Sequence, residues 1–212
     1  MDIKTELLGY SQTYQWYTGQ PLNLSDNSII NLIRFAFDPT VGNKMAKKIL
    51  NSFPLKDNWQ ARFRFGGDLS GWKDINYDGW QSSASHGVRF NTDEIDRLIF
   101  NISGKTRKID KWINDIQVVV EIILSKYPNL SELYLQPVIG CNQDNNKIRA
   151  SKNHADILFA INKYIENSNN NKLKLGAVFK VNHDEFSDKV GHLTATGANK
   201  AKKYIMDFYD NL

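Results

Sequence analysis

Apolar residues follow two spacings that alternate along the chain. Short apolar runs, which are typical of buried strands, occupy residues 3–8, 97–103, 132–140 and 172–181. Apolar residues recur every three or four positions, as on one face of a helix, over residues 28–37, 109–127, 154–166 and 197–209. Apolar strands that are separated by helices build a parallel sheet with helices on both faces. The pattern therefore predicts an α/β fold, a three-layer α/β/α sandwich around a central parallel sheet.

One long stretch, residues 40–92, has little periodicity and is rich in glycine and tryptophan. The chain has 212 residues, of which 41% are hydrophobic, enough for one core. We therefore expect residues 1–212 to form a single domain, with the stretch at about 40–92 as an insertion.

Aromatic residues gather after residue 13 and in the glycine-rich stretch. They are Tyr14, Trp16, Tyr17, Trp59, Trp72, Tyr77 and Trp80. We expect at least half of them to belong to the core. The flat faces of any others would suit a sugar ring or an acyl chain.

Composition argues against several classes of protein. The net charge is +4, but the lysines are scattered, so we expect no nucleic-acid partner. The single cysteine, Cys141, cannot form an internal disulfide or a thiolate metal site, and the four histidines lack metal-ligand spacing, so we expect no metal or other cofactor. The longest apolar run, residues 116–124, is too short to span a membrane. The N-terminus lacks a signal-peptide pattern, which predicts a cytoplasmic protein, or a secreted one if the start is processed.

Candidate chemistry lies just beyond the predicted strands, where ligands bind in such sheets. Ser11 follows the first strand and Gly9, while Asp188 and His192 precede the C-terminal helix. A serine needs a base to become a nucleophile, and the base needs a group that holds its tautomer, so the three residues predict a catalytic triad. Taken singly, such a serine is more often a turn or helix cap, and such a histidine more often a structural or surface residue.

Two segments resemble the SGNH (GDSL-like) hydrolases. "LLGYSQTYQW", residues 7–16, is similar to the family's first block, a strand followed by Gly-Asp-Ser. "FSDKVGHLTATGANKAKKYIMDFY", residues 186–209, is similar to the last block, Asp-x-x-His-Leu-Thr-x-x-Gly followed by a helix. The order of elements fits the family over residues 3–12 and 93–212.

The resemblance implies a flavodoxin-like three-layer fold and hydrolysis of a carboxylic ester through an acyl-enzyme. Ser11 would be the nucleophile, His192 the base and Asp188 the acid that orients it. The substrate would be an acetyl or acyl ester of a carbohydrate or small molecule. We expect the Ser11 N–H and a glycine N–H, from Gly9 or Gly104, to bind the oxyanion, and Trp16 to contact the substrate.

The chain departs from the family pattern at three places. Tyr10 stands where the first block has Asp. The third block, Gly-x-Asn-Asp, has no Asn here, because Gly104 is followed by Lys-Thr-Arg. In the family that Asn donates a hydrogen bond to the oxyanion, and losing such a donor costs about 3 kcal/mol of transition-state stabilisation. Thr106, Arg107 or Asn142 would have to replace it.

The third departure concerns the acid, which the family places three residues before the histidine. Asp188 lies four residues before His192, and Asp184 is a further candidate for its role. The family also has a conserved glycine in its second block, and several positions of this chain could correspond to it. They are Gly66, Gly67, Gly71, Gly79 and Gly87.

Two functions follow from these patterns. The first is a serine esterase of the SGNH type. The second is a binding protein on the same scaffold, which has lost catalysis and recognises a saccharide or a peptide. Fold alone does not separate them, because function depends on the site.

Overall fold

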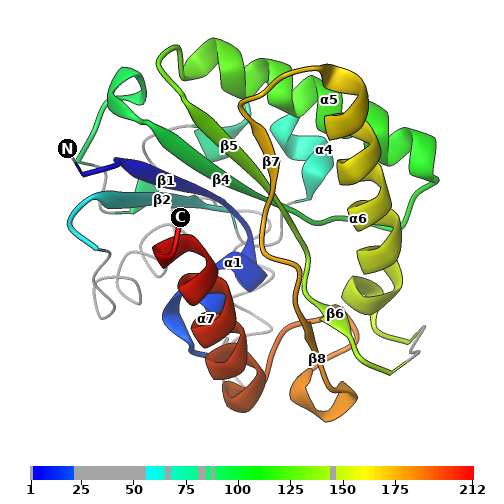
Figure 1. The fold of residues 1–212 in the computed structure, drawn as a ribbon. Coiled ribbons are helices and arrows are strands. Elements are labelled where there is room, and N and C mark those ends of the chain that lie inside the picture. Colours follow the sequence, from blue (N-terminus) through cyan, green and yellow to red (C-terminus); the bar gives the residue numbers. More distant parts are fainter. Residues whose placement is uncertain (1, 22–55, 65–67, 81–84, 87–88, 144–146) are drawn as a thin grey trace.

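The computed structural model describes residues 2–21, 56–64, 68–80, 85–86, 89–143 and 147–212. Within these ranges the chain forms a six-stranded sheet in the order β3-β2-β1-β4-β5-β7 (Figure 1). The strands are β1 (Thr5–Gly9), β2 (Trp59–Phe63), β3 (Ser85–His86), β4 (Arg97–Ile102), β5 (Glu132–Pro137) and β7 (Leu173–Leu175). All neighbours pair in parallel except β3, which runs antiparallel to β2. The five parallel strands have the flavodoxin-like order, as predicted.

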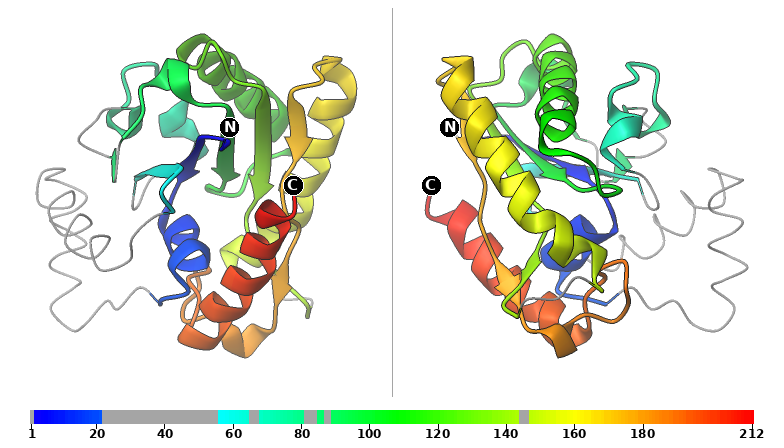
Figure 2. Two further views of the ribbon diagram at one scale, coloured as in Figure 1. Left: turned by 60° about the vertical axis from the view of Figure 1, so that its left-hand side comes forward. Right: turned by 90° about the vertical axis from the view of Figure 1, so that its right-hand side faces the viewer.

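Helices cover the two faces of this sheet in pairs. The longer helices of the described residues are α1 (Ser11–Thr18), α5 (Ile109–Lys126), α6 (Arg149–Ser168) and α7 (Ala195–Asp210). Helix α1 packs against α7, and α5 packs against α6 on the other face (Figures 1 and 2). Helix α1 follows β1, and the next strand, β2, lies on one side of β1, whereas α5 and α6 lie in connections that run the other way along the sheet, from β4 to β5 and from β5 to β7. Right-handed crossovers therefore place α1 and the α5–α6 pair on opposite faces. The predicted three-layer α/β/α fold is confirmed.

The helical spacing of apolar residues explains α5 and α7. In α5 the buried face includes Trp112, Ile116 and Ile123, and the helix ends just before Pro128. Helix α7 begins at a cap, because the Thr194 hydroxyl accepts a hydrogen bond from the Gly197 N–H at 3.3 Å. None of the helices in the described ranges is both long and apolar enough to cross a membrane.

Helix α6 begins five residues earlier than its apolar spacing predicts. The N–H groups of Arg149 and Ala150 donate to the carbonyl oxygens of Lys189 and Val190 at 2.9 and 3.3 Å. These donors have no partner inside a helix, so a distant loop satisfies the helix start. The boundary therefore depends on a tertiary contact that the local sequence does not contain.

The strand expected over 172–181 divides into two. Strand β7 belongs to the main sheet, whereas β8 (Lys180–Val181) pairs with β6 (Gly140–Cys141) in a second, two-stranded sheet. Between them, Gly176 lies so close to α7 that a Cβ there would come within 2.6 Å of the Tyr209 hydroxyl. The chain leaves the main sheet after this contact.

Strand β2 lies within the stretch at 40–92, so part of that stretch belongs to the sheet. Its polar residues Gln60 and Arg62 are buried because Glu6 of β1 accepts hydrogen bonds from both. The apolar residues of β2 alternate with these polar ones, so the strand has a period-two signal that sequence reasoning missed. The helix expected over 28–37 and much of the stretch at 40–92 lie outside the described residues.

Candidate active site

Ser11, His192 and Asp188 form one chain of hydrogen bonds at the carboxyl edge of the sheet. The Ser11 Oγ lies 2.9 Å from His192 Nε2. The His192 Nδ1 lies 2.5 Å from Asp188 Oδ2. Ser11 opens α1 directly after β1, and His192 lies three residues before α7, which packs beside α1 (Figure 1). The structure thus brings together the three side chains that the sequence singled out.

The turn between β1 and α1 places the Ser11 hydroxyl at the carboxyl edge of the sheet. A Cβ on Gly9 would come within 2.1 Å of the Thr13 hydroxyl oxygen, so only glycine lets the helix begin this close to the strand. The Thr13 hydroxyl accepts a hydrogen bond from the Tyr10 N–H at 3.1 Å and donates one to Asn101 of β4 at 2.8 Å. These contacts tie the first turn of α1 to the sheet.

The carboxylate of Asp188 organises the loop that carries the histidine. Its Oδ1 accepts hydrogen bonds from the backbone N–H groups of Val190, Gly191 and His192 at 2.9, 2.9 and 3.1 Å. Partial burial alone would raise the pKa of Asp188, but these bonds and the His192 ring hold that pKa well below its usual value. An ionised carboxylate accepts the Nδ1 proton, which leaves Nε2 free to accept the Ser11 proton.

The spacing of four residues between acid and histidine is accommodated by Gly191. Its φ is +108°, and a Cβ there would lie 2.2 Å from that of Ala150. Asp184, the other candidate acid, is exposed in the short 3-10 helix His183–Glu185. Of the two, Asp188 is the one that pairs with His192.

The positions proposed for the oxyanion site differ in what they can donate. The Ser11 N–H has no hydrogen-bond partner among the described residues. The Thr106 hydroxyl donates to Asn153 Oδ1 at 2.8 Å, and Asn153 donates to the Gly104 carbonyl at 2.9 Å. The Asn142 side chain donates to another asparagine at 3.0 Å. Both side chains thus have acceptors of their own.

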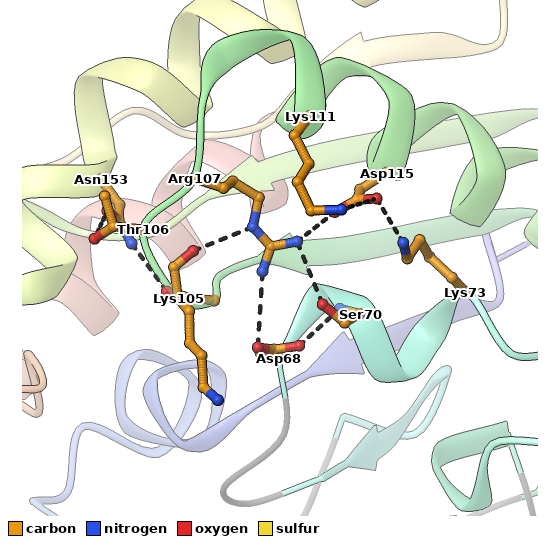
Figure 3. A network of polar contacts seen from close by, with 10 residues as sticks. Asp68, Ser70, Lys73, Lys105, Thr106, Arg107, Lys111, Asp115 and Asn153 are labelled. Atoms are coloured by element: carbon orange, nitrogen blue, oxygen red, sulfur yellow. Dashed lines mark hydrogen bonds and ion pairs between the residues drawn. The ribbon is translucent and has the colours of Figure 1, made fainter.

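Arg107, the third proposed replacement, is held in a network of polar contacts (Figure 3). Its guanidinium group pairs with Asp115 and lies 3.7 Å from Asp68, and it also contacts Ser70 at 3.4 Å. It lies 4.3 Å from the centre of the Trp112 ring. Burial would raise the pKa of Asp115, but hydrogen bonds from Lys73, at 2.6 Å, and from Arg107 outweigh burial and lower that pKa. These contacts hold the Arg107 side chain in place, and Arg107 thereby stabilises the loop after β4.

Trp16 does not face a crevice. Its ring is completely buried and stacks on Tyr209 of α7, with 6.3 Å between ring centres. The expectation that Trp16 contacts substrate does not fit this position, since a buried ring has no free face. Most of the other aromatic residues singled out above are also in the core, as predicted. These are Tyr14, Tyr17, Trp59, Trp72 and Trp80.

Two residues of this region were missed by sequence reasoning. Gln12 and Gln15 lie on α1 and are buried, and their side-chain amides bind the backbone on both sides of His192. In the sequence they stand out only as polar residues in a short aromatic-rich segment. That position does not show which groups they bind. Within the described ranges, no group of three or more His, Cys, Asp or Glu side chains is placed to hold a metal ion.

Comparison with known proteins supports the fold. No protein-family model and no curated protein sequence matches this chain. A family two carbohydrate esterase from Clostridium thermocellum, solved in complex with cellohexaose, superimposes with a TM-score of 0.56 over 100% of this chain, at 10% identity. The acetyl xylan esterase Est2A from the rumen bacterium Butyrivibrio proteoclasticus superimposes with a TM-score of 0.54 over 99% of this chain, at 15% identity.

The fold resembles that of carbohydrate esterases. The similarity to SGNH hydrolases, which two short motifs predicted, is thereby confirmed at the level of the fold. This chain spans 64% of the length of each of these two esterase structures.

Proposed function

We propose that the protein is a serine esterase that acts on a carboxylic ester through an acyl-enzyme. The observation that carries the proposal is the continuous hydrogen-bond chain from Ser11 through His192 to Asp188, with 2.9 and 2.5 Å between the bonded atoms. A nucleophile within hydrogen-bond reach of a base, which a third group orients, is the arrangement that serine acyl transfer requires.

In the first half of the reaction, Ser11 Oγ attacks the ester carbonyl carbon while His192 Nε2 accepts the hydroxyl proton. The tetrahedral intermediate then collapses, and His192 gives that proton to the oxygen of the leaving alcohol. In the second half, water attacks the acyl-serine, His192 accepts a proton from the water, and Ser11 recovers it as the acid departs. Asp188 stays ionised throughout and stabilises the imidazolium.

The negative charge on the carbonyl oxygen is stabilised by backbone donors. The Ser11 N–H lies in the first turn of α1, whose N–H groups favour a negative charge. A glycine N–H, from Gly9 or Gly104, is the second donor. The role assigned to the family's missing Asn thus falls on the backbone, because Thr106 and Asn142 donate elsewhere.

An acetyl ester of a carbohydrate is the substrate that we propose. The two similar structures are a family two carbohydrate esterase and an acetyl xylan esterase. No cofactor is needed, since the three side chains and water supply every proton and bond.

The test is hydrolysis of p-nitrophenyl acetate by the native protein and by Ser11→Ala and His192→Ala. Each substitution should lower kcat by about a thousandfold or more while circular dichroism stays unchanged. Ser125→Ala is the control, because that exposed hydroxyl lies near the far end of α5 and donates to the Ile122 carbonyl at 2.8 Å. A fluorophosphonate probe should label Ser11 alone. Equal background rates in all four proteins, with no labelling, would refute the proposal.

The missing third-block Asn favours one alternative, a binding protein that holds a saccharide or a peptide in the same crevice. Specific retention on a glycan array by a protein that neither hydrolyses esters nor reacts with the probe would establish it.

A further inference from the structure

Two buried glutamines of helix α1 form hydrogen bonds with the segment that carries His192. Gln12 is 5% exposed and Gln15 is fully buried. They lie three residues apart, so both project from one side of the helix toward residues 191–193. We call this pair the glutamine clamp.

Gln15 binds both backbone groups of one residue. Its Nε2 donates to the Leu193 carbonyl at 2.8 Å, and its Oε1 accepts from the Leu193 N–H at 3.0 Å. Two hydrogen bonds to one peptide segment fix both its distance from α1 and its rotation. Leu193 directly follows the histidine.

Gln12 binds on the other side of the histidine. Its Nε2 donates to the Gly191 carbonyl at 3.0 Å, and its Oε1 accepts from the Ile139 N–H, beyond β5, at 2.7 Å. The Gln12 amide therefore joins α1, the end of β5 and the histidine loop. All four contacts of the clamp have good hydrogen-bond lengths, as buried amides require.

The clamp links the two reacting groups without touching either side chain. Ser11 directly precedes Gln12 on α1, and His192 lies between the two residues whose backbone the clamp holds. The bonds of Asp188 fix the histidine ring relative to its own loop, but they do not fix that loop relative to α1.

We propose that Gln12 and Gln15 are positioning residues that set the distance between Ser11 Oγ and His192 Nε2. The inference rests on the serine esterase function proposed above. The remaining contacts between α1 and α7 include the apolar stack of Trp16 on Tyr209, which lacks the directionality of a hydrogen bond. They also include a hydrogen bond from Lys202 Nζ to the Thr18 carbonyl at 3.3 Å, which lies at the other end of α1 from Ser11. Proton transfer needs that directionality, because a misplacement of about 1 Å lowers a rate by about a hundredfold.

The experiment replaces each glutamine with methionine, which has nearly the same length and no hydrogen-bonding amide. Gln12→Met and Gln15→Met should each lower kcat for p-nitrophenyl acetate by about ten- to a hundredfold, with KM within about twofold of the native value. The rate of reaction with a fluorophosphonate probe should fall in parallel, since that reaction needs the activated serine but no sugar contacts.

Gln60→Met is the matched control. Gln60 is also completely buried, donates to Glu6 at 2.8 Å and accepts from the N–H groups of Arg89 and Phe90 at 3.1 and 2.9 Å. It lies on β2 opposite Glu6, toward the far end of β1 from Ser11. This variant should lose stability as the clamp variants do and keep the native kcat.

A second measurement separates positioning from mere folding. The proton on His192 Nδ1, which is shared with Asp188, should give a low-field proton NMR signal in the native protein. That signal should move or broaden in the clamp variants and stay in place in Gln60→Met. If Gln15→Met does not fold, Gln12→Met decides the question.

The outcomes distinguish this inference from the proposed function. A native protein without turnover refutes the esterase, and the NMR signal still tests the clamp. An active native protein whose folded clamp variants keep the native kcat and probe rate refutes the positioning role alone. An equal loss of kcat in Gln60→Met refutes it too, because instability would then explain the effect.

Discussion

Asp188→Asn separates the two tasks of the acid, which are to fold the histidine loop and to set the histidine tautomer. In the native protein Oδ1 accepts three backbone N–H groups, while Oδ2 accepts the His192 Nδ1 proton. An asparagine amide has one oxygen and one NH₂ group. Turning its oxygen toward the three N–H donors keeps three hydrogen bonds, worth about 1 kcal/mol each, so this orientation is favoured.

The NH₂ group then faces His192 Nδ1 and donates to it. The ring proton must move to Nε2, which can no longer accept the proton of Ser11. In a serine protease triad the wrong tautomer lowers kcat by about 10⁴-fold, which corresponds to about 5 kcal/mol of transition-state stabilisation. We expect a loss of that size in Asp188→Asn, together with a melting temperature below the native one, because the charge is lost, but above that of Asp188→Ala, because the three N–H groups keep an acceptor.

The assay is p-nitrophenyl acetate hydrolysis, with thermal unfolding followed on the same samples. Asp188→Ala should lose activity and also stability, because it leaves the three backbone donors without their acceptor. Asp184→Asn is the control: Asp184 is exposed, and His192 pairs with Asp188 instead, so activity should be unchanged.

Activity of Asp188→Asn within about tenfold of the native rate would refute this reasoning, because a tautomer-dependent base cannot tolerate the change. A melting temperature of Asp188→Asn no higher than that of Asp188→Ala would also refute it, since the loop would then depend on the charge alone and not on the acceptor geometry.

Three further predictions concern the triad and its surroundings. Gly191→Ala places a Cβ 2.2 Å from that of Ala150 at a φ of +108°, so the free energy of unfolding in urea should fall by about 2–5 kcal/mol; native stability would contradict the geometry of this turn. Arg107→Met removes one of the two close partners of the buried Asp115 carboxylate, while Lys73 stays at 2.6 Å, so it should cost about 1.5–3 kcal/mol in the same assay, with partial recovery in Arg107→Lys. Because the pKa of Asp188 is lowered in the folded state, its carboxylate stabilises the fold above the ordinary Asp pKa of about 3.9 and loses that effect as the pH falls. The difference in unfolding free energy between the native protein and Asp188→Ala should therefore shrink below about pH 5, and a difference independent of pH would contradict this account.

The sequence by itself determined the class of fold and singled out the three side chains that meet in the candidate site. The helices α5 and α7 follow from apolar spacing, and the parallel strands from apolar runs between them. Ser11 and His192 were found because each lies next to a strand or helix boundary, where glycine and cap residues leave a local signal.

Only the tertiary structure decided which groups pair. Strand β2 shows the alternation of a strand, but the burial of its polar residues Arg62 and Gln60 depends on Glu6 of the neighbouring strand, 54 or more positions away. The choice of Asp188 over Asp184 depends on how the loop folds around one carboxylate. Hydrophobic spacing is a local property of the chain, whereas a buried polar side chain is defined by a partner that folding brings from elsewhere. For Gln15 that partner is Leu193, 178 residues away.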